Sequence, residues 1–424
     1  MLPVLAAPAG ADSLTTALVA VALITVVAQA LGALLERCGQ PRVIGEILGG
    51  IALGPSLLGA LAPGLEATLF GPAVRAQLNL LGQLGLALFM FLIGLELNPA
   101  LLRGRLPLAS RVSAVGIALP LLLGVGLSDL LERWLPELLP GERRLAGALF
   151  MGTAMAITAF PVLARILQER DLIRRPLGAL TISVAAIDDL LSWILLAAVV
   201  AFARSGSALG ALQPLLLTAA WALLLLVGLR PWRRWLERLH RHRGQLGPLL
   251  QVSLLAGALL SGAVTEAIGV HLIFGAFLWG LAMPRHAPLH LELEQRLQSV
   301  VLQLMLPLFF AISGLNTRLN ALDSPDLWAA TALVLLVAVA GKFLGAWATA
   351  RLSGVPPREA QALGWLVNTR GLTELVILNV GLGLGVISPT LFSMGVLMAI
   401  ATTLMTGPLL ERLGYGRQPS PDRL

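Results

Sequence analysis

Five ionisable residues lie inside apolar stretches of this chain, where a charge is costly. Asp188 and Asp189 are consecutive in the segment VAAIDDLLSW, and Lys342 lies in VAGKFLGAW. Arg370 and Glu374 share the segment NTRGLTELV. An ionisable side chain at the centre of a membrane span costs about 2.5–3.5 kcal/mol on insertion scales, so each of the five is a candidate functional residue.

The two aspartates point about 100° apart on a helix, and two carboxylates in a low dielectric do not both ionise without a cation nearby. Lys342 is the candidate partner, because the other 29 basic residues are all arginine. A need for a compact ammonium would explain a lysine at this one position. The alternative is that codon bias favours arginine throughout the chain and this one lysine is left by chance. Pairing one carboxylate with Lys342 leaves the other free to bind either a proton or a small cation. Such competition is itself an exchange mechanism.

The composition indicates a membrane protein. Of the 424 residues, 57% are hydrophobic and 12% are charged, whereas ordinary soluble domains carry roughly a quarter charged residues. The net charge of +7 comes from arginines in short loops, so it does not predict nucleic-acid binding. The lone cysteine, Cys38, excludes an internal disulfide and a thiolate cluster for a metal. We expect no cofactor.

Apolar stretches of about 20 residues predict an all-α polytopic membrane protein with about 13 transmembrane helices. The predicted spans are 14–35, 42–60, 77–97, 108–128, 145–166, 177–203, 208–229, 247–264, 268–283, 299–316, 326–350, 359–383 and 388–410.

The loops predict the orientation of these spans. Connections that follow odd-numbered spans, with the C-terminal tail, hold 22 arginines, and the other connections hold 6. The positive-inside rule therefore places the N-terminus outside and the C-terminus in the cytoplasm, in the plasma (inner) membrane. The lead-in LAAPAGA has no basic region before it, so no cleaved signal peptide is predicted. Residues 230–243 predict a basic amphipathic helix on the cytoplasmic interface, and its simplest role is a topology anchor.

An internal repeat predicts two halves of opposite orientation. The segment QLGLALFMFLIGL (83–95) aligns with QLMLPLFFAISGL (303–315) at seven of thirteen positions. These are spans 3 and 10, and an odd offset inverts the second copy, as in secondary transporters with inverted repeats. On this register span 5 corresponds to span 12, and span 6 to span 13. We expect spans 5 and 12 to be broken helices that cross at the bilayer midplane and build the ion site.

Hydroxyl groups in the two broken spans are candidate cation ligands. Span 5 contributes Thr153 and Thr158 beside the helix breaker Pro161, and span 12 contributes Thr369 and Thr373 beside Gly371, Arg370 and Glu374. Each threonine has a simpler alternative, a hydrogen bond to its own helix backbone. Three further carboxylates, Glu46, Glu96 and Glu266, lie nearer span ends, where contact with water or with a loop arginine is expected.

Several segments together resemble the cation:proton antiporter-2 family, with the greatest similarity to its CHX-type cation/proton exchangers. They are AITAFPVLARIL, AAIDDLLSWILLA, LPLFFAISGLNT, GKFLGAW and LGWLVNTRGLTELVILNVGL with FSMGVLMAIATTLMTGPLL. The resemblance covers about residues 20–410 and implies a homodimer of thirteen-helix subunits. It also implies a dimerisation domain (1–106 and 247–322), a core that shifts like an elevator (107–206 and 323–424), and a linker helix with the basic segment (207–246).

The resemblance also assigns roles to residues. It implies that Asp189 exchanges cation for proton, that Asp188 pairs with Lys342, and that Thr158 is the polar residue of the first broken helix. Many CHX-type exchangers have Asn-Asp where this chain has Asp188 and Asp189, a pair that resembles electrogenic sodium/proton antiporters. Both K⁺ and Na⁺ stay open as the transported ion.

The sequence therefore predicts a monovalent cation/proton antiporter that needs no nucleotide or resident metal. The alternatives on the same fold are a cation-coupled solute symporter, which needs a wide polar cavity, and a channel-like K⁺ efflux protein. An enzyme is not expected, because no histidine pair within a span has metal-ligand spacing and no serine lies in a nucleophile elbow.

Overall fold

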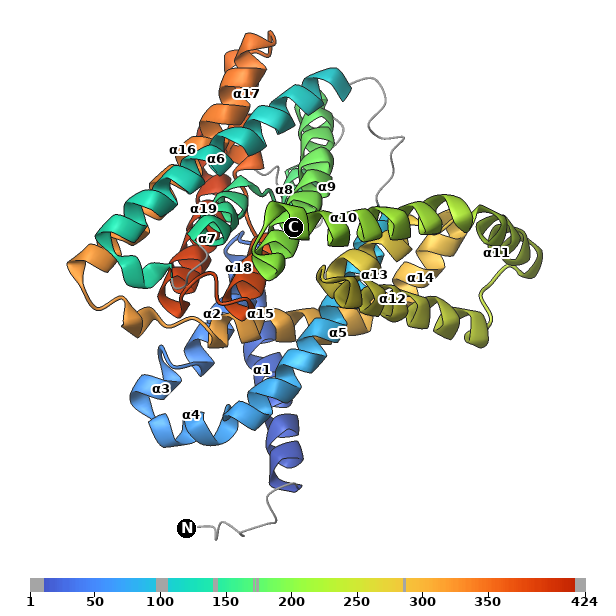
Figure 1. The fold of residues 1–424 in the computed structure, drawn as a ribbon, viewed down its shortest axis with the longest axis horizontal. Coiled ribbons are helices and arrows are strands. Elements are labelled where there is room, and N and C mark those ends of the chain that lie inside the picture. Colours follow the sequence, from blue (N-terminus) through green and yellow to red (C-terminus); the bar gives the residue numbers. More distant parts are fainter. Residues whose placement is uncertain are drawn as a thin grey trace, which may run out of the picture. The chain divides into compact units, whose positions relative to one another are not determined.

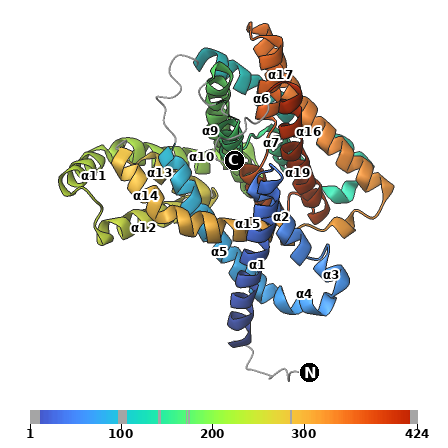
Figure 2. The same cartoon turned by 180° about the vertical axis from the view of Figure 1, so that it is seen from behind.

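A computed structural model describes residues 11–96, 106–139, 144–170, 172, 175–284 and 287–415. The described residues form helices joined by short connections, with no strand among them (Figure 1; Figure 2 from behind). The predicted all-α fold is confirmed. Nine helices of the described part are long and apolar enough to span a membrane, or up to ten if one bent pair is a single span. The count of thirteen stays a prediction, and the lead-in before Ala11 lies outside the described residues.

The chain divides into two compact units. Unit 1 comprises Met1–Glu96, Leu224–Val264 and Gly275–Ala321, and unit 2 comprises Leu97–Leu223, Thr265–Phe274 and Leu322–Leu424. The division into dimerisation and core domains stays a prediction.

Unit 1 is built mainly from the N-terminal helices and the middle of the chain. Its elements, two of which extend into unit 2, are α1 (Ala11–Arg37), α2 (Arg42–Leu53), α3 (Leu58–Leu61), α4 (Pro63–Leu69), α5 (Pro72–Glu96), the π-helix Leu224–Gly228, α11 (Arg230–Arg243), α12 (Pro248–Ile268), α13 (Leu272–Leu281), α14 (Ala287–Val300), the π-helix Val301–Met305, α15 (Leu306–Leu315) and a short 3₁₀ turn, Leu319–Ala321. The predicted span 42–60 is interrupted after Leu53, where Gly54 and Pro55 follow. The predicted amphipathic segment 230–243 is a helix with the same bounds, α11.

Two glycines allow α2 and α15 to pack with their backbones in close approach. A Cβ atom on Gly314 would lie 2.3 Å from the carbonyl oxygen of Ile47, and one on Gly50 would lie 2.0 Å from that of Ala311. Contacts this short cannot be relieved by a side-chain rotation, because the clashing atoms belong to the backbone. Small residues at such crossings are typical of membrane helices.

We expect Gly314→Ala to destabilise the protein by about 1–3 kcal/mol, as overpacking of a close-packed interior does. A thermal melt of the purified protein in detergent measures the effect. Gly116→Ala in α6 is the matched control, because a Cβ there meets nothing within 4 Å. Equal melting temperatures for the two variants would contradict the close packing of α2 and α15.

Unit 2 contains the remaining helices. They are α6 (Leu106–Trp134), the 3₁₀ turn Pro136–Leu138, α7 (Arg144–Ala156), α8 (Phe160–Glu169), α9 (Pro176–Ser205), α10 (Ala208–Leu223), α16 (Pro325–Leu352), α17 (Pro357–Val367), α18 (Leu372–Gly383) and α19 (Pro389–Arg412). Helix α6 packs along α16 and α7, and the two views show α6 and α16 side by side (Figures 1 and 2). Helix α9 packs against α6, α7, α8 and α17.

Two of the predicted spans are broken in the middle. Span 145–166 is divided into α7, which ends at Ala156, and α8, which begins at Phe160. Span 359–383 is divided into α17, which ends at Val367, and α18, which begins at Leu372. The backbone N–H of Ala159 donates to the carbonyl of Thr369 at 3.0 Å, so the two breaks touch. The predicted pair of crossed, broken helices is confirmed.

Candidate functional site

A buried ion pair lies beside the first break. The Lys342 Nζ of α16 donates to the Asp188 Oδ2 of α9 at 2.8 Å and to the Ala156 carbonyl at 2.6 Å. The two charged side chains are 0% and 1% exposed. The Thr158 hydroxyl lies 2.8 Å from the same Asp188 oxygen and 2.9 Å from the Val367 carbonyl. Since a hydroxyl has one proton, Thr158 donates a hydrogen bond to only one of these two acceptors at a time.

Cations also compensate the carboxyl end of α7. Breaking the span frees the carbonyls of its last turn, which carry the negative end of the helix dipole. Arg370 donates to the carbonyls of Ala154 at 2.5 Å and Met155 at 2.6 Å, next to the Ala156 carbonyl that Lys342 binds. Arg370 also pairs with Glu374 at 2.8 Å, and both side chains are fully buried. Lys342 and Arg370 thus donate hydrogen bonds to the free carbonyls at the C-terminal end of α7.

Asp189 differs from its neighbour in having no basic partner among the residues that the structure describes. Its side chain is 2% exposed, and no basic side chain of the described residues forms an ion pair with it. Its Oδ2 accepts a hydrogen bond from the Trp193 indole N–H at 3.3 Å, and its Oδ1 has no hydrogen-bond partner among the described residues. The Trp193 ring is held edge-on against Phe274, with ring centroids 5.9 Å apart.

Other buried oxygens in unit 2 also lack a partner among the described residues. They are the hydroxyls of Ser113 and Ser192, the second oxygens of Asp188 and Glu374, and the amide oxygen of Asn368. Carboxylate, hydroxyl and amide oxygens are the ligands that hard cations take. The carboxyl group of Asp189 is likewise of a type that binds a small cation or a proton.

The predicted threonines differ in their surroundings. Thr153 bonds to the Leu149 carbonyl of its own helix at 2.7 Å, as the simpler alternative anticipates. Thr369 lies 3.3 Å from the Thr406 hydroxyl, and Thr373, in the first turn of α18, interacts with Asp189.

Sequence reasoning missed Trp193 and a group of hydroxyls on α19. Thr403 donates to the Arg370 carbonyl at 2.5 Å, and Thr406 bonds to Thr369. Two signals were available in the sequence. Trp193 lies four residues after Asp189, so the two share a helix face. Thr402, Thr403 and Thr406 lie in span 13, the repeat counterpart of the span with the aspartates.

The three carboxylates predicted near span ends have different environments. Glu266 pairs with Arg204 at 2.7 Å, and both side chains are partly exposed. Glu46 is 7% exposed within α2, so it has little contact with water, and its pairing with a loop arginine stays a prediction. The reason is packing, since the face of α2 that carries Glu46 also carries the close approaches to α1 and α15. The side chain of Glu96 lies outside what the structure describes.

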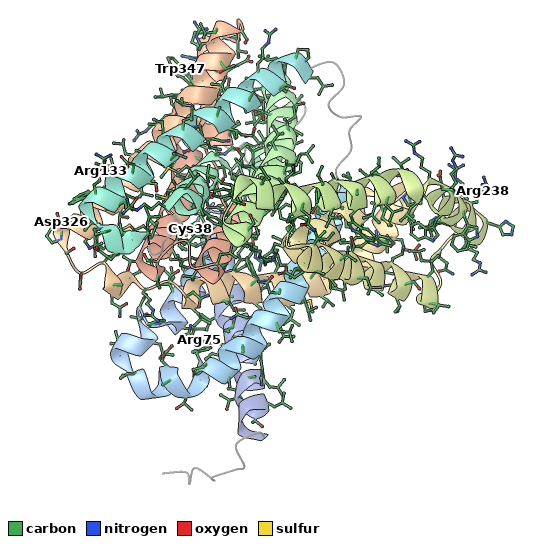
Figure 3. All side chains as sticks on the ribbon, in the orientation of Figure 1. Cys38, Arg75, Arg133, Arg238, Asp326 and Trp347 are labelled. Atoms are coloured by element: carbon green, nitrogen blue, oxygen red, sulfur yellow. The ribbon has the colours of Figure 1, made fainter. Side chains whose placement is uncertain are left out.

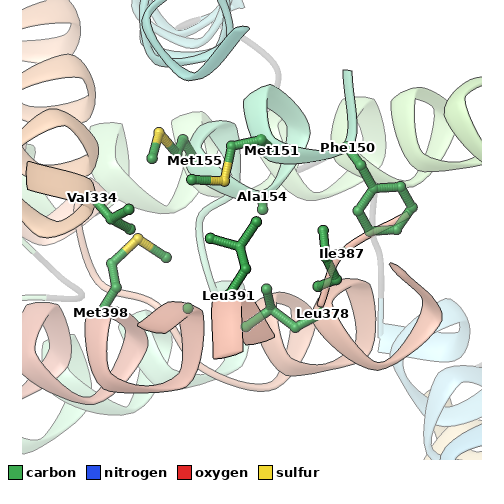
Figure 4. Close-up of a pocket in the computed structure, with 10 residues that line it drawn as sticks. Phe150, Met151, Ala154, Met155, Val334, Leu378, Ile387, Leu391 and Met398 are labelled. Atoms are coloured by element: carbon green, nitrogen blue, oxygen red, sulfur yellow. The ribbon is translucent and has the colours of Figure 1, made fainter. Parts of the chain in front are cut away.

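A small cavity next to α7 is lined only by apolar residues and a glycine. Met151, Met155 and Met398 contribute side chains to it, with Phe150 and Leu391 (Figure 4). Its side chains offer no hydrogen-bond donor, and their only acceptors are the weak thioether sulfurs of methionine. This cavity is therefore not the wide polar chamber that a cation-coupled solute symporter needs.

Comparison with known proteins identifies the family. Residues 18–413 match the family model described as "Sodium/hydrogen exchanger, transmembrane". The chain belongs to the sodium/hydrogen exchanger family. It is thus an integral membrane protein of a transporter family, which confirms the resemblance to cation/proton antiporters and the expectation that it is not an enzyme.

Individual members of the exchanger family cover nearly the whole chain. It is 44% identical over 405 residues to the Na⁺/H⁺ antiporter NhaS4 of Synechocystis, covering 95% of this chain and 98% of the relative. It is 36% identical over 378 residues to the K⁺/H⁺ antiporter 1 of Saccharomyces cerevisiae, covering 88% of this chain and 44% of the relative. The chain spans about half the length of the curated plant relatives it matches.

The exchanger fold is also found in a solved structure. The sodium/proton antiporter MjNhaP1 of Methanocaldococcus jannaschii matches with a TM-score of 0.67 at 15% identity, covering 95% of this chain and 98% of that one. At this identity the match shows the fold alone.

Proposed function

We propose that this protein exchanges a monovalent cation, Na⁺ or K⁺, for protons across a membrane. The observation that carries the proposal is that only one of two adjacent buried carboxylates is paired with a basic side chain. Asp188 forms an ion pair with Lys342, whereas Asp189 accepts from the Trp193 indole N–H and has one oxygen without a partner among the described residues. The names of the relatives, antiporters of Na⁺ or K⁺ with H⁺, support the same reaction.

In the proposed cycle, Asp189 binds either the cation or a proton, and a pH difference across the membrane decides which. Asp188, held by Lys342 and Thr158, keeps a fixed negative charge beside the site. Arg370 and Glu374 keep the ends of the broken helices in place while Asp189 changes its ligand. Weak-acid chemistry suffices, and no cofactor is required.

We further propose an elevator-type movement of unit 2 in a homodimer, with the N-terminus outside and the C-terminus in the cytoplasm. Unit 2 holds both broken helices and every charged residue of the proposed site, which supports its role as the moving part. The arginine asymmetry of the loops supports the orientation.

The test is exchange in proteoliposomes that hold a pH gradient. Adding K⁺ or Na⁺ should dissipate the gradient, and solid-supported-membrane electrophysiology should report which ion is preferred and whether charge moves. A proton flux that requires an added organic solute would instead establish a symporter. A conductance that persists without a proton gradient would establish a channel.

Trp193→Phe should alter the apparent affinity for the cation. The indole N–H competes with the cation for Asp189 Oδ2, and a neutral hydrogen bond contributes about 0.5–1.5 kcal/mol. At a fixed alkaline pH, we expect a KM for the cation that is lower by about threefold to tenfold, with little change in the maximal rate. Trp347→Phe is the matched control, because it makes the same substitution at a tryptophan whose ring stacks on Phe343. Identical KM values for wild type and Trp193→Phe would show that the Trp193 indole does not compete with the cation for Asp189.

A further inference from the structure

The outward face of α11 carries arginines that the proposed exchange does not use. Arg230, Arg234, Arg238 and Arg241 follow at spacings of four, four and three residues, so they lie along one side of the helix. All four are exposed. Figure 3 labels Arg238 on α11, among side-chain nitrogens that point away from the ribbon. We call these four residues the arginine stripe.

The opposite face of α11 is docked within unit 1. Leu236 is fully buried, and the Nε2 of the buried His240 lies 2.9 Å from the Oε2 of Glu292 in α14. Burial alone would raise the pKa of Glu292, but hydrogen bonds from His240 and the Leu246 N–H, together with the charge of the paired Arg296, hold this pKa below its usual value. Glu292 thus serves as an ionised anchor at neutral pH. The anchor fixes the rotation of α11 and keeps the stripe facing outward.

The charge of the stripe is largely uncompensated. Glu237, the one acidic residue of α11, pairs with Arg241. Arg230, Arg234 and Arg238 make no ion pair or hydrogen bond with any residue that the structure describes. Burial, and after it the charges of Arg230 and Arg234, lower the pKa of the neighbouring Arg233. A set of self-repelling cations on one face gains from an external anion.

The neighbours of α11 in sequence restrict what that anion can be. The helix follows the π-helix Leu224–Gly228 after a single residue, and α12, a candidate membrane span, begins at Pro248. A basic helix tied this closely to apolar spans lies at the membrane surface. Trp235, which lies between Arg234 and Arg238 in sequence, is 50% exposed, and an exposed indole suits the headgroup layer.

We propose that the arginine stripe binds the phosphate groups of anionic phospholipids, with Trp235 in the headgroup layer. Guanidinium groups make bidentate, charge-assisted hydrogen bonds to phosphate oxygens, and several such groups in a row match a layer of headgroups better than one free ion. This contact is independent of the exchange reaction, because it involves no residue of the proposed transport site.

Native mass spectrometry of the full-length protein in a non-ionic detergent tests the proposal. With phosphatidylglycerol added, the wild type should retain bound lipid, and with phosphatidylcholine it should retain far less. The triple variant R230Q/R234Q/R238Q should bind phosphatidylglycerol about 100-fold more weakly, from the typical contribution of each basic residue near an anionic surface. Raising the salt concentration should weaken the wild-type binding.

The control variant R111Q/R358Q/R412Q removes the same charge from three other exposed arginines and should bind phosphatidylglycerol as the wild type does. Equal lipid binding by the stripe variant and the wild type would overturn the proposal. So would stabilisation by inorganic phosphate, in a thermal melt, that equals the stabilisation by phosphatidylglycerol, since it would show a site for a free anion. Melting temperatures without lipid check that both triple variants fold.

Discussion

Replacing Asp189 with asparagine should abolish cation/proton exchange and leave the fold intact. An amide keeps the shape of the side chain and one oxygen, but it has no proton to release and no charge to hold a cation. Because no basic residue that the structure describes pairs with Asp189, the substitution leaves no described basic side chain without its partner, and it removes the cost of burying an unpaired carboxylate. We expect a loss of at least about 100-fold in exchange rate, the scale of removing a group that acts directly on the proton.

The measurement is the decay of a pH gradient in proteoliposomes after addition of K⁺ or Na⁺, together with a thermal melt of the same preparation. Asp129→Asn is a suitable control, because this carboxylate is exposed at the end of α6 and pairs with Arg133. The control should exchange as the wild type does. Normal exchange by the Asp189→Asn variant would show that another group carries the proton.

The elements that position the site could be predicted from sequence, because their signals are local. Apolar length identifies the spans, and Pro161 and Gly371 indicate breaks in spans 5 and 12, which correspond to each other in the repeat. The single lysine among arginines singled out Lys342 before any contact was known. Composition shows that this residue is exceptional, and an ionisable residue in an apolar span is a candidate functional residue.

The remaining features depend on distances between helices, which no local pattern contains. Asp188 and Asp189 are adjacent and chemically identical, and only the tertiary structure places Lys342 against one and the Trp193 indole against the other. Glu46 near a predicted span end gave no sign of being buried, because its exclusion from water results from packing of other helices onto α2. The carbonyl acceptors of Arg370 likewise exist only because α7 ends at Ala156.

Lys342→Gln should destabilise the protein more than any other single substitution at the site. It leaves Asp188 buried without its counter-charge and removes a donor from the Ala156 carbonyl. Removing one partner of a buried ion pair typically costs about 3–5 kcal/mol. A thermal melt in detergent should show a large fall in melting temperature, and an unchanged value would contradict the pair.

The double variant Lys342→Gln with Asp188→Asn separates the charge from the packing. If the cost is the unpaired carboxylate, neutralising Asp188 should restore most of the stability, and the two effects should be strongly non-additive. Exchange by this double variant then tests the function of the pair, because Asp189 would act without a fixed charge pair beside it.

Lys342→Arg keeps the charge but brings a larger, planar group into a fully buried position. It should fold less stably than the wild type and exchange more slowly, and normal exchange would show that a positive charge suffices and that the compact ammonium is not needed.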